Sequence, residues 1–375
     1  MKVTLLEYSL SHNCLVRSHV LAQILQRNHQ VEIAGPVNES GIWEPLADKY
    51  DYVPIETGSR IYQFPRSIPE FRERIDGDVL WARKPRGVSF GLGLVLRRLD
   101  DIPLLLDIED WEAGLITANR SHPWLRAIPD LINCNSLYYT SLLESLTSWA
   151  NGVTVSNTFL QSKFGGELIP HVRNEAVFDP ERFNPAAAKE ELGLPQDDFL
   201  ITFIGTPRRH KGVHVIAEAI AELDRDDVRL LVVGTDESSY TKELRQIAGD
   251  RLITVGPQPF DDVPKWVSVA DLVAVPQNGA EGISGQIPAK VFDAMAMGVP
   301  VIYTPISDLP EILDGCGVRI ERDDPELLRE AIIDLLDDPD RRHRLGQAGR
   351  RRFIRRYSVQ SCIDTVERLL QTACE

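Results

Sequence analysis

The sequence predicts an α/β protein of two domains, each built on a parallel, doubly wound sheet. Three observations support this prediction. The length of 375 residues fits two domains at roughly 100–200 residues each. Short apolar runs alternate with segments of helical periodicity in both halves of the chain. Between the halves, residues 170–185 contain three prolines and few periodic apolar positions, which is typical of a connection between domains.

The composition is that of an ordinary globular protein and excludes several classes of function. Hydrophobic residues make up 43% of the chain and charged residues 26%. The net charge of −15 argues against nucleic-acid binding, because such binding needs a basic face. The five cysteines are odd in number and include no Cys-x-x-Cys pair, so they indicate neither a disulfide framework nor a zinc site.

The sequence also shows no targeting or membrane signal. Glu7 follows the start too closely for a signal peptide, and no apolar run approaches the ~18 residues of a membrane span. We therefore expect a cytoplasmic protein with at most peripheral membrane contact. The basic residues Arg83–Arg86 and the pair Arg97-Arg98 could face acidic head groups or a phosphorylated acceptor, but a solvated loop and helix end is the more typical interpretation.

The first half begins with a strand–helix–strand unit. Apolar residues predict strands over residues 1–8 and Val31–Ala34, and helical spacing predicts a helix over Cys14–Gln26. Ligands bind at the carboxyl ends of the strands in such sheets, so the polar turn after the first strand faces a potential cleft. Its side chains could bind a ligand or simply cap the helix; the candidates are Ser11, His12 and Asn13.

Carboxylates end one of the later strands of the first half. Further strands are expected at Tyr52–Ile55, Val79–Ala82, Leu104–Ile108 and Gly152–Val155, with the clearest helices at Val88–Leu99 and Leu137–Ala150. Asp107, Glu109 and Asp110 lie at the end of the apolar strand, where like charges are unusual. These carboxylates suit general-base work or hydroxyl binding; the alternative is a capped loop with solvated acids.

The second half repeats the strand–helix alternation. Strands are expected at Leu200–Ile204, Arg229–Val233, Leu252–Val255, Leu272–Val275 and Pro300–Tyr303. Helices are expected at Val213–Leu223, Thr241–Ala248, Val263–Val269, Ala289–Met297, Leu309–Leu313, Pro325–Asp337, Asp340–Tyr357 and Val359–Thr372.

The stretch Phe203–Gly212 (FIGTPRRHKG) combines a strand end, a turn at Gly205 and a basic cluster before a helix. Free N–H groups and the helix dipole favour an anion at such a turn. Arginine and lysine add a bidentate fork and a point charge, which suit a diphosphate. The alternative is an ordinary strand–helix turn with a solvated basic cluster, because short glycine motifs occur often by chance.

Several stretches in a fixed order give this chain a resemblance to the retaining glycosyltransferases of family 4, which have the GT-B fold. They are VRNEAVFDPERFNP (172–185), FIGTPRRHKGVHVIAEAI (203–220), QIPAKVFDAMAMGVPVIYT (286–304) and LGQAGRRRFIRRYS (345–358). The resemblance covers the C-terminal half almost throughout. In the N-terminal half it is limited to the opening strand–helix–strand unit and SLTSWANGVTVSN (145–157).

The resemblance implies two Rossmann-like domains that face each other across a cleft. It places an acceptor-binding domain at residues 1–172, joined by the last helix at 359–375. A connector spans 173–185, and the domain that binds the nucleotide sugar spans 186–358. The expected partners are a nucleoside diphosphate sugar and a sugar, lipid-linked or small-molecule acceptor. No cofactor or metal is expected, because the sequence has no Asp-x-Asp and the cationic loop supplies the charge of a metal ion.

The resemblance also assigns donor-binding residues. Lys211 and Arg208 would bind the diphosphate, with Arg209 competing for the arginine role. Asp293 stands where the family has the second Glu of a Glu-x7-Glu motif, which typically holds the ribose hydroxyls. The glycine turn and the segment on which the nucleobase rests add Gly205, Gly256 and Pro257.

The chain departs from the family pattern at the first Glu of that motif. The expected position holds Gly285, and Glu281 lies four residues too early. Either the loop bulges to bring Glu281 to the sugar, or backbone amides of Gly285 to Ile287 and the side chain of Gln286 hold it instead. Lys290 either adds a further phosphate cation or caps its helix.

A second departure lies in the acceptor domain. Many family members have a His after the strand that corresponds to Leu104–Ile108, whereas this chain has Glu109 and Asp110. Retention in the family is attributed to front-face attack, in which the departing phosphate oxygen takes the acceptor proton. On that mechanism Glu109 and Asp110 orient the acceptor.

The resemblance therefore implies a retaining, hexosyltransferase-like enzyme of glycan, glycolipid or glycoconjugate biosynthesis. A phosphorylase or sugar-phosphate synthase of the same fold is one alternative, and a non-catalytic two-lobed nucleotide- or sugar-binding protein is another. A dinucleotide-dependent dehydrogenase is disfavoured, since no Gly-x-Gly-x-x-Gly follows the first strand. The sequence leaves open the nucleobase, the sugar, the acceptor and the oligomeric state.

Overall fold

The computed structural model covers residues 1–375 and describes all of them except 58–59, 119–129 and 279–284. The chain divides into two compact units. Unit 1 comprises Met1–Val172 and Val359–Glu375, together with Gly285 and Gln286. Unit 2 comprises the other described residues, from Arg173 to Ser358.

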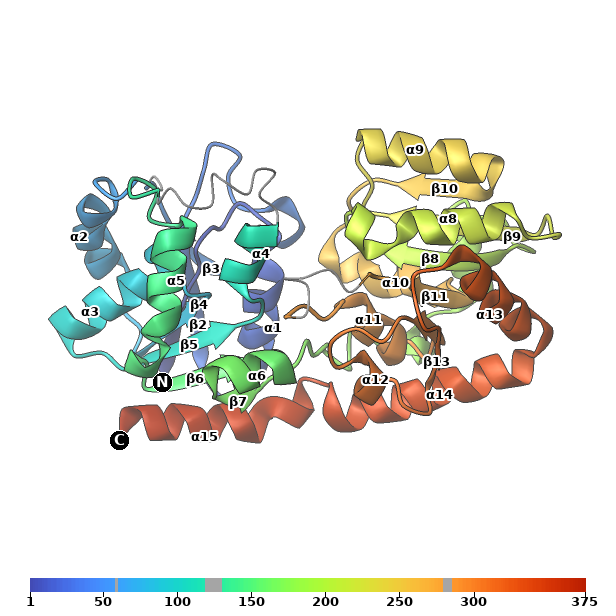
Figure 1. Ribbon diagram of the computed structural model, residues 1–375. Coiled ribbons are helices and arrows are strands. Elements are labelled where there is room, and N and C mark those ends of the chain that lie inside the picture. The colour runs from blue at the N-terminus through green and yellow to red at the C-terminus, as the bar shows by residue number, and fades with distance from the viewer. Residues whose placement is uncertain (58–59, 119–129, 279–284) are drawn as a thin grey trace. The chain divides into compact units, whose positions relative to one another are not determined.

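Unit 1 contains a seven-stranded sheet in the order β3-β2-β1-β4-β5-β6-β7, and every pairing in it is parallel (Figure 1). Its strands are β1 (Lys2–Leu6), β2 (Gln30–Pro36), β3 (Asp51–Ile55), β4 (Val79–Arg83), β5 (Leu104–Ile108), β6 (Gly152–Val155) and β7 (Glu167–Leu168). Every residue of β4 and β5 is buried, as expected for central strands of a parallel sheet that is covered on both faces.

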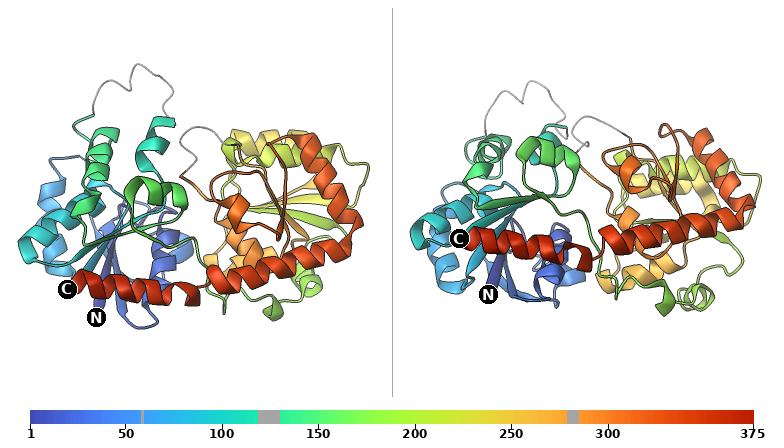
Figure 2. Two further views of the ribbon diagram at one scale, coloured as in Figure 1. Left: turned by 60° about the horizontal axis from the view of Figure 1, so that its bottom comes forward. Right: turned by 90° about the horizontal axis from the view of Figure 1, so that it is seen from below.

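The helices of unit 1 come from both ends of the sequence. They are α1 (Leu15–Leu25), α2 (Phe64–Arg74), α3 (Leu92–Asp100), α4 (Glu112–Ala118), α5 (Leu137–Ser145), α6 (Thr158–Phe164) and α15 (Ile363–Cys374). The last helix, α15, packs against α1 and β6, and its Glu367 carboxylate bonds to Asn28 and His29 after α1. The two chain termini therefore lie close together in this unit (Figure 2).

Unit 2 contains a six-stranded parallel sheet in the order β10-β9-β8-β11-β12-β13. Its strands are β8 (Phe199–Ile204), β9 (Val228–Val233), β10 (Leu252–Val255), β11 (Leu272–Val275), β12 (Val301–Tyr303) and β13 (Gly317–Arg319). Its helices are α7 (Pro185–Glu191), α8 (Val213–Ala221), α9 (Ser239–Ala248), α10 (Val263–Ser268), α11 (Lys290–Ala296), α12 (Leu309–Ile312), α13 (Pro325–Asp337) and α14 (Pro339–Arg356).

Most predicted elements are present with small shifts at their ends, and five have the predicted bounds: β5, β6, β10, β11 and α13. Helix α13 has clear end signals, since Asp324 caps it and Pro325 opens it. The helix expected over Val88–Leu99 is instead a π-turn at Gly87–Gly91 followed by α3. Strands β7 and β13 were not predicted, because two or three residues are too few to show a period.

Each sheet has one place where the order of the strands reverses. In unit 1 this switch point lies between β1 and β4, and in unit 2 between β8 and β11. Ligands of doubly wound sheets bind at such points, outside the carboxyl ends of the strands. Among the helices that the structure describes, none combines the length and apolar character needed to cross a bilayer.

Candidate functional site

The loop after β8 lies at the switch point of unit 2 and is held there by a glycine. Gly212 has φ +72°, and a Cβ at this position would lie 2.0 Å from the carbonyl oxygen of Pro276, just after β11. Only glycine combines this backbone conformation with so close an approach. The Asn278 N–H also donates to the His210 carbonyl at 3.3 Å. The basic loop and the end of β11 therefore meet where a ligand is expected.

Basic side chains from two elements gather at this loop. Lys211 Nζ donates to the Thr206 carbonyl at 2.9 Å, and burial, with the Arg208 charge, lowers the pKa of Lys211 to about 8. Lys290 begins α11, with Nζ 4.2 Å from the centre of the Phe203 ring. Burial and the Lys211 charge lower the pKa of Lys290 to about 7, although Asp293 opposes the change.

These cations are not paired with carboxylates in the part of the chain that the structure describes. Within the described residues, Arg208, Lys211 and Lys290 form no ion pair with a carboxylate. Burial and the same cations lower the pKa of His210. Partly buried like charges without a counterion are costly, so an anionic ligand would stabilise this cluster.

The two arginines of the loop differ in their surroundings. The Arg209 side chain is 63% exposed, and its Nη2 pairs with both Glu243 oxygens at 2.5 and 2.7 Å. Its guanidinium carbon also lies over the Tyr240 ring, 5.7 Å from the ring centre. Arg208 has no such partner among the described residues. The geometry therefore favours Arg208 for an anionic ligand.

Asp293 projects from α11 into the interior of unit 2. It is 7% exposed, and its Oδ1 accepts a hydrogen bond from Nε of Arg173 at 2.5 Å. Arg173 was not predicted as a site residue, because it lies in the non-periodic connector, 120 residues before Asp293. Asn278 was also missed; its buried Oδ1 has no partner among the described residues.

The other predicted donor residues are spread over several places. Gly256 and Pro257 are exposed at the carboxyl end of β10. The Ile287 side chain packs in the apolar core of unit 2. The Gly285 carbonyl accepts from Asn157 Nδ2 at 3.0 Å and so belongs with Gln286 to unit 1. Glu281 lies outside the described residues. Gly205, with φ +108°, makes the turn after β8.

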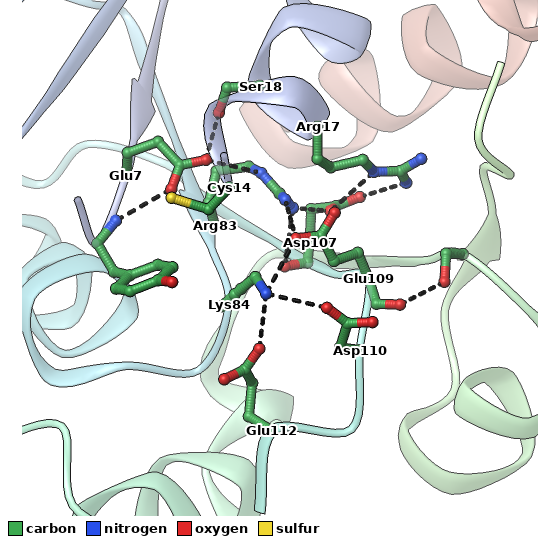
Figure 3. A network of polar contacts seen from close by, with 12 residues as sticks. Glu7, Cys14, Arg17, Ser18, Arg83, Lys84, Asp107, Glu109, Asp110 and Glu112 are labelled. Atoms are coloured by element: carbon green, nitrogen blue, oxygen red, sulfur yellow. Dashed lines mark hydrogen bonds and ion pairs between the residues drawn. The ribbon is translucent and has the colours of Figure 1, made fainter. Parts of the chain in front are cut away.

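The switch point of unit 1 carries a buried ionic network (Figure 3). The Asp107 carboxylate accepts hydrogen bonds from Nη2 of Arg17 at 2.8 Å, from the Thr154 hydroxyl at 2.7 Å and from Nη1 of Arg83. The Arg83 guanidinium also lies 3.3 Å from Glu7 after β1. The prediction of a solvated loop over Arg83–Arg86 is therefore wrong for Arg83 and Lys84. Both side chains are buried, and carboxylates of β5 and of the segments after β1 and β5 compensate their charge.

Lys84 forms ion pairs with both predicted carboxylates, Glu109 and Asp110. It is 6% exposed, and its Nζ lies 3.0 Å from Glu109, 3.0 Å from Asp110 and 2.7 Å from Glu112. Burial alone would raise the pKa of Glu109, but Lys84 and Arg83 outweigh it and lower that pKa. Burial, opposed by Lys84, raises the pKa of Asp110 to about 6. Two carboxylates with different proton affinities thus share one cation at this edge.

The turn after β1 contributes less than the acids. The Ser11 hydroxyl accepts the Asn38 N–H at 3.0 Å and so supports the neighbouring loop. His12 and Asn13 are exposed. In the described part of the chain, no three His, Cys, Asp or Glu side chains gather as a metal site would require.

Comparisons with known proteins give a family match for part of unit 2 and a fold for nearly the whole chain. Residues 198–338 match the family described as glycosyl transferases group 1. A GDP-mannose-dependent monoacylated alpha-(1-6)-phosphatidylinositol monomannoside mannosyltransferase of Corynebacterium glutamicum is 29% identical over 52% of this chain and 54% of its own. A D-inositol 3-phosphate glycosyltransferase of Segniliparus rotundus is 33% identical over 49% of this chain and 42% of its own. The chain thus spans about half the length of the curated relatives it matches.

Solved structures match over nearly the whole chain. HepE from Anabaena in complex with UDP and glucose has a TM-score of 0.76 at 15% identity and covers 99% of both chains. Sucrose-phosphate synthase from Thermosynechococcus elongatus has a TM-score of 0.73 at 19% identity, over 99% of this chain and 98% of its own. The predicted GT-B fold is confirmed.

Proposed function

We propose that this chain transfers a sugar from a nucleoside diphosphate sugar to an acceptor hydroxyl with retention, as a member of the glycosyl transferases group 1 family (family 4) that its residues 198–338 match. One observation carries the proposal. Arg208, Lys211 and Lys290 form a cation cluster at the switch point of unit 2 that makes no ion pair with a carboxylate of the described residues, and Lys290 lies on the same helix as Asp293.

In this proposal the cluster binds the donor diphosphate. The leaving diphosphate gains negative charge as the glycosidic bond breaks, and Lys211 and Arg208 stabilise that charge in the transition state. Lys290 adds a third cation on the side of α11. Asp293 accepts a hydrogen bond from a ribose hydroxyl. The departing phosphate oxygen takes the acceptor proton, so no strong protein base is needed, and Glu109 and Asp110 orient the acceptor.

The printed names of the relatives suggest which substrates to test. One relative uses GDP-mannose and acts on a phosphatidylinositol mannoside, others act on inositol phosphate, and HepE binds UDP and glucose. We propose a UDP- or GDP-hexose donor and a polyol or sugar acceptor, free or lipid-linked. The five free cysteines fit a reducing compartment, and we propose the cytoplasm.

A phosphorylase of the same fold is less well supported. It would need a second phosphate pocket in unit 1, for which Arg83, Lys84 and Arg86 were the candidates. All three are engaged by carboxylates: Arg83 by Asp107, Lys84 by Glu109, and Arg86 by a Glu112 oxygen. These cations are therefore not available to a phosphate.

Two steps test the proposal. First, thermal shift with UDP, GDP, ADP and their sugars identifies the donor, because a ligand that binds only the native state raises its stability. Second, Lys211→Ala should lower turnover with that donor by on the order of 100-fold, as loss of one oxyanion donor does. Lys242→Ala, an exposed lysine on α9, is the control and should stay fully active. Near-wild-type transfer by Lys211→Ala would refute the assignment.

Asp293→Ala separates the ribose contact from the diphosphate contact. Loss of the carboxylate should weaken nucleoside diphosphate binding, because the ribose hydroxyl of the bound nucleotide then lacks its hydrogen-bond acceptor. Calorimetric titration with UDP or GDP measures the effect. An unchanged dissociation constant would count against the ribose role of Asp293 while leaving the diphosphate role of Lys211 intact.

A further inference from the structure

We propose that Arg173 is a positioning residue of the donor site: it holds one oxygen of Asp293 so that the other oxygen receives the ribose hydroxyl. The inference rests on the proposed function, since it assumes the ribose role of Asp293. It adds a residue from the connector, outside the stretches in which Lys211, Lys290 and Asp293 lie.

The pair is buried and directional. Arg173 is 3% exposed and Asp293 7%, and the bond of 2.5 Å joins Nε to Oδ1. In the part of the chain that the structure describes, Oδ2 of Asp293 accepts no side-chain hydrogen bond. A carboxylate that is fixed through one oxygen presents the other oxygen in a defined direction.

The Arg173 side chain is itself held on several sides. Its guanidinium carbon lies 5.8 Å from the ring centres of both Phe178 and Phe260. These two rings pack edge to face, with 6.3 Å between their centres. Nη2 also lies 3.5 Å from the Ala289 carbonyl, which precedes α11. Aromatic faces favour a guanidinium over an ammonium group, so this frame suits arginine and not lysine.

The main chain of Arg173 is fixed at the boundary of unit 2. Arg173 is the first residue of the unit, and Ser358 is the last. The two form an isolated parallel bridge, and the Arg173 N–H donates to the Tyr357 carbonyl at 3.1 Å. The Tyr357 ring packs on Phe292, the neighbour of Asp293, at 5.0 Å between centres. Both ends of unit 2 thus meet at the residue that holds Asp293.

A structural role alone and a positioning role predict different results. If Arg173 only stabilised the fold, its loss would weaken the binding of every nucleotide to the same extent. If Arg173 orients Asp293, its loss should weaken the binding of ribonucleotides specifically, because the Asp293 carboxylate no longer directs Oδ2 at the ribose.

The experiment compares UDP and GDP with their 2′,3′-dideoxy forms by calorimetric titration. Wild-type protein should prefer the ribonucleotide by at least about tenfold, the worth of one hydrogen bond to a charged group. Arg173→Met should reduce this preference to about threefold or less, and Arg173→Lys should be intermediate. Arg182→Met is the matched control, because Arg182 lies in the same connector, is exposed, and its side chain bonds only to the Ala176 carbonyl among the described residues. It should keep the wild-type preference.

Each outcome supports or overturns a named claim. An unchanged ribose preference in Arg173→Met refutes the positioning role, even if both affinities fall together. If Arg173→Met does not fold, an unchanged preference in Arg173→Lys refutes it equally. A wild-type protein that binds UDP or GDP without any ribose preference refutes the role of Asp293, and this inference with it. A wild-type protein that binds neither nucleotide refutes the proposed function itself.

Discussion

Single residues of the donor site differ in how far the sequence could identify them. Lys211 and Asp293 lie in short patterns whose neighbours carry the signal, so they were predicted. Arg173 was not, because its partner lies 120 residues away and only folding brings the two together. The burial of Lys84 was missed for the same reason, since the carboxylates that compensate it follow a different strand.

The lowered pKa values of two lysines predict pH-dependent donor binding. Lys211 at about 8 and Lys290 at about 7 are partly neutral near pH 8, whereas a bound diphosphate favours their charged forms. Binding should therefore take up protons, and affinity should fall as the pH rises from 7 to 9. Titration at pH 8 in two buffers of different ionisation enthalpy measures the proton uptake. Lys290→Arg should take up fewer protons, because a guanidinium stays charged; equal uptake in both proteins would contradict the prediction.

The buried pair of Arg17 and Asp107 predicts a large loss of stability on truncation. Arg17 Nη2 lies 2.8 Å from Asp107 Oδ1, with both side chains at most 1% exposed. Arg17→Met should lower the free energy of unfolding by about 3–5 kcal/mol, since it leaves a buried carboxylate with less compensation. Urea denaturation measures the loss. Arg72→Met breaks an exposed pair with Asp100 and should change stability far less; equal losses would show that burial does not set the energy.

Among the elements, those with a clear period or clear end signals were predicted most accurately. The buried strand β5 and the capped helix α13 have the expected bounds. The two-residue strand β7 and the three-residue strand β13 have no period, and their pairing depends on the neighbouring strand. Helix α2 contains Pro69, which argues locally against a helix even though tertiary packing accepts it.

The turn between β8 and α8 gives a prediction at the scale of an element. Gly212→Ala places a Cβ against the Pro276 carbonyl at a backbone φ of +72°, so the loop must move away from β11. We expect at least about tenfold weaker nucleotide binding and a loss of more than about 1 kcal/mol of stability. Gly193→Ala is the matched control, because Gly193 has φ +67° with no atom within 4 Å of its Cβ. Equal effects on nucleotide binding would show that the contact with Pro276 is irrelevant.

At the scale of the whole molecule, the two units were not equally predictable. Unit 2 contains the residues 198–338 that match the family, and its site residues follow from short patterns. Unit 1 shows only the general strand–helix alternation, and its ionic network joins Glu7 after β1 with residues of α1, β4 and β5 that no local pattern connects. The donor half of the reaction is therefore easier to infer than the acceptor half.

The most direct test of the central claim is the anomeric configuration of the product, determined by NMR. With the donor selected by thermal shift and a polyol or sugar acceptor, the wild-type protein should release the nucleoside diphosphate and form a glycoside with the configuration of the donor. Lys211→Ala should form it on the order of 100-fold more slowly. A product of inverted configuration, or equal rates in the two proteins, would contradict the account.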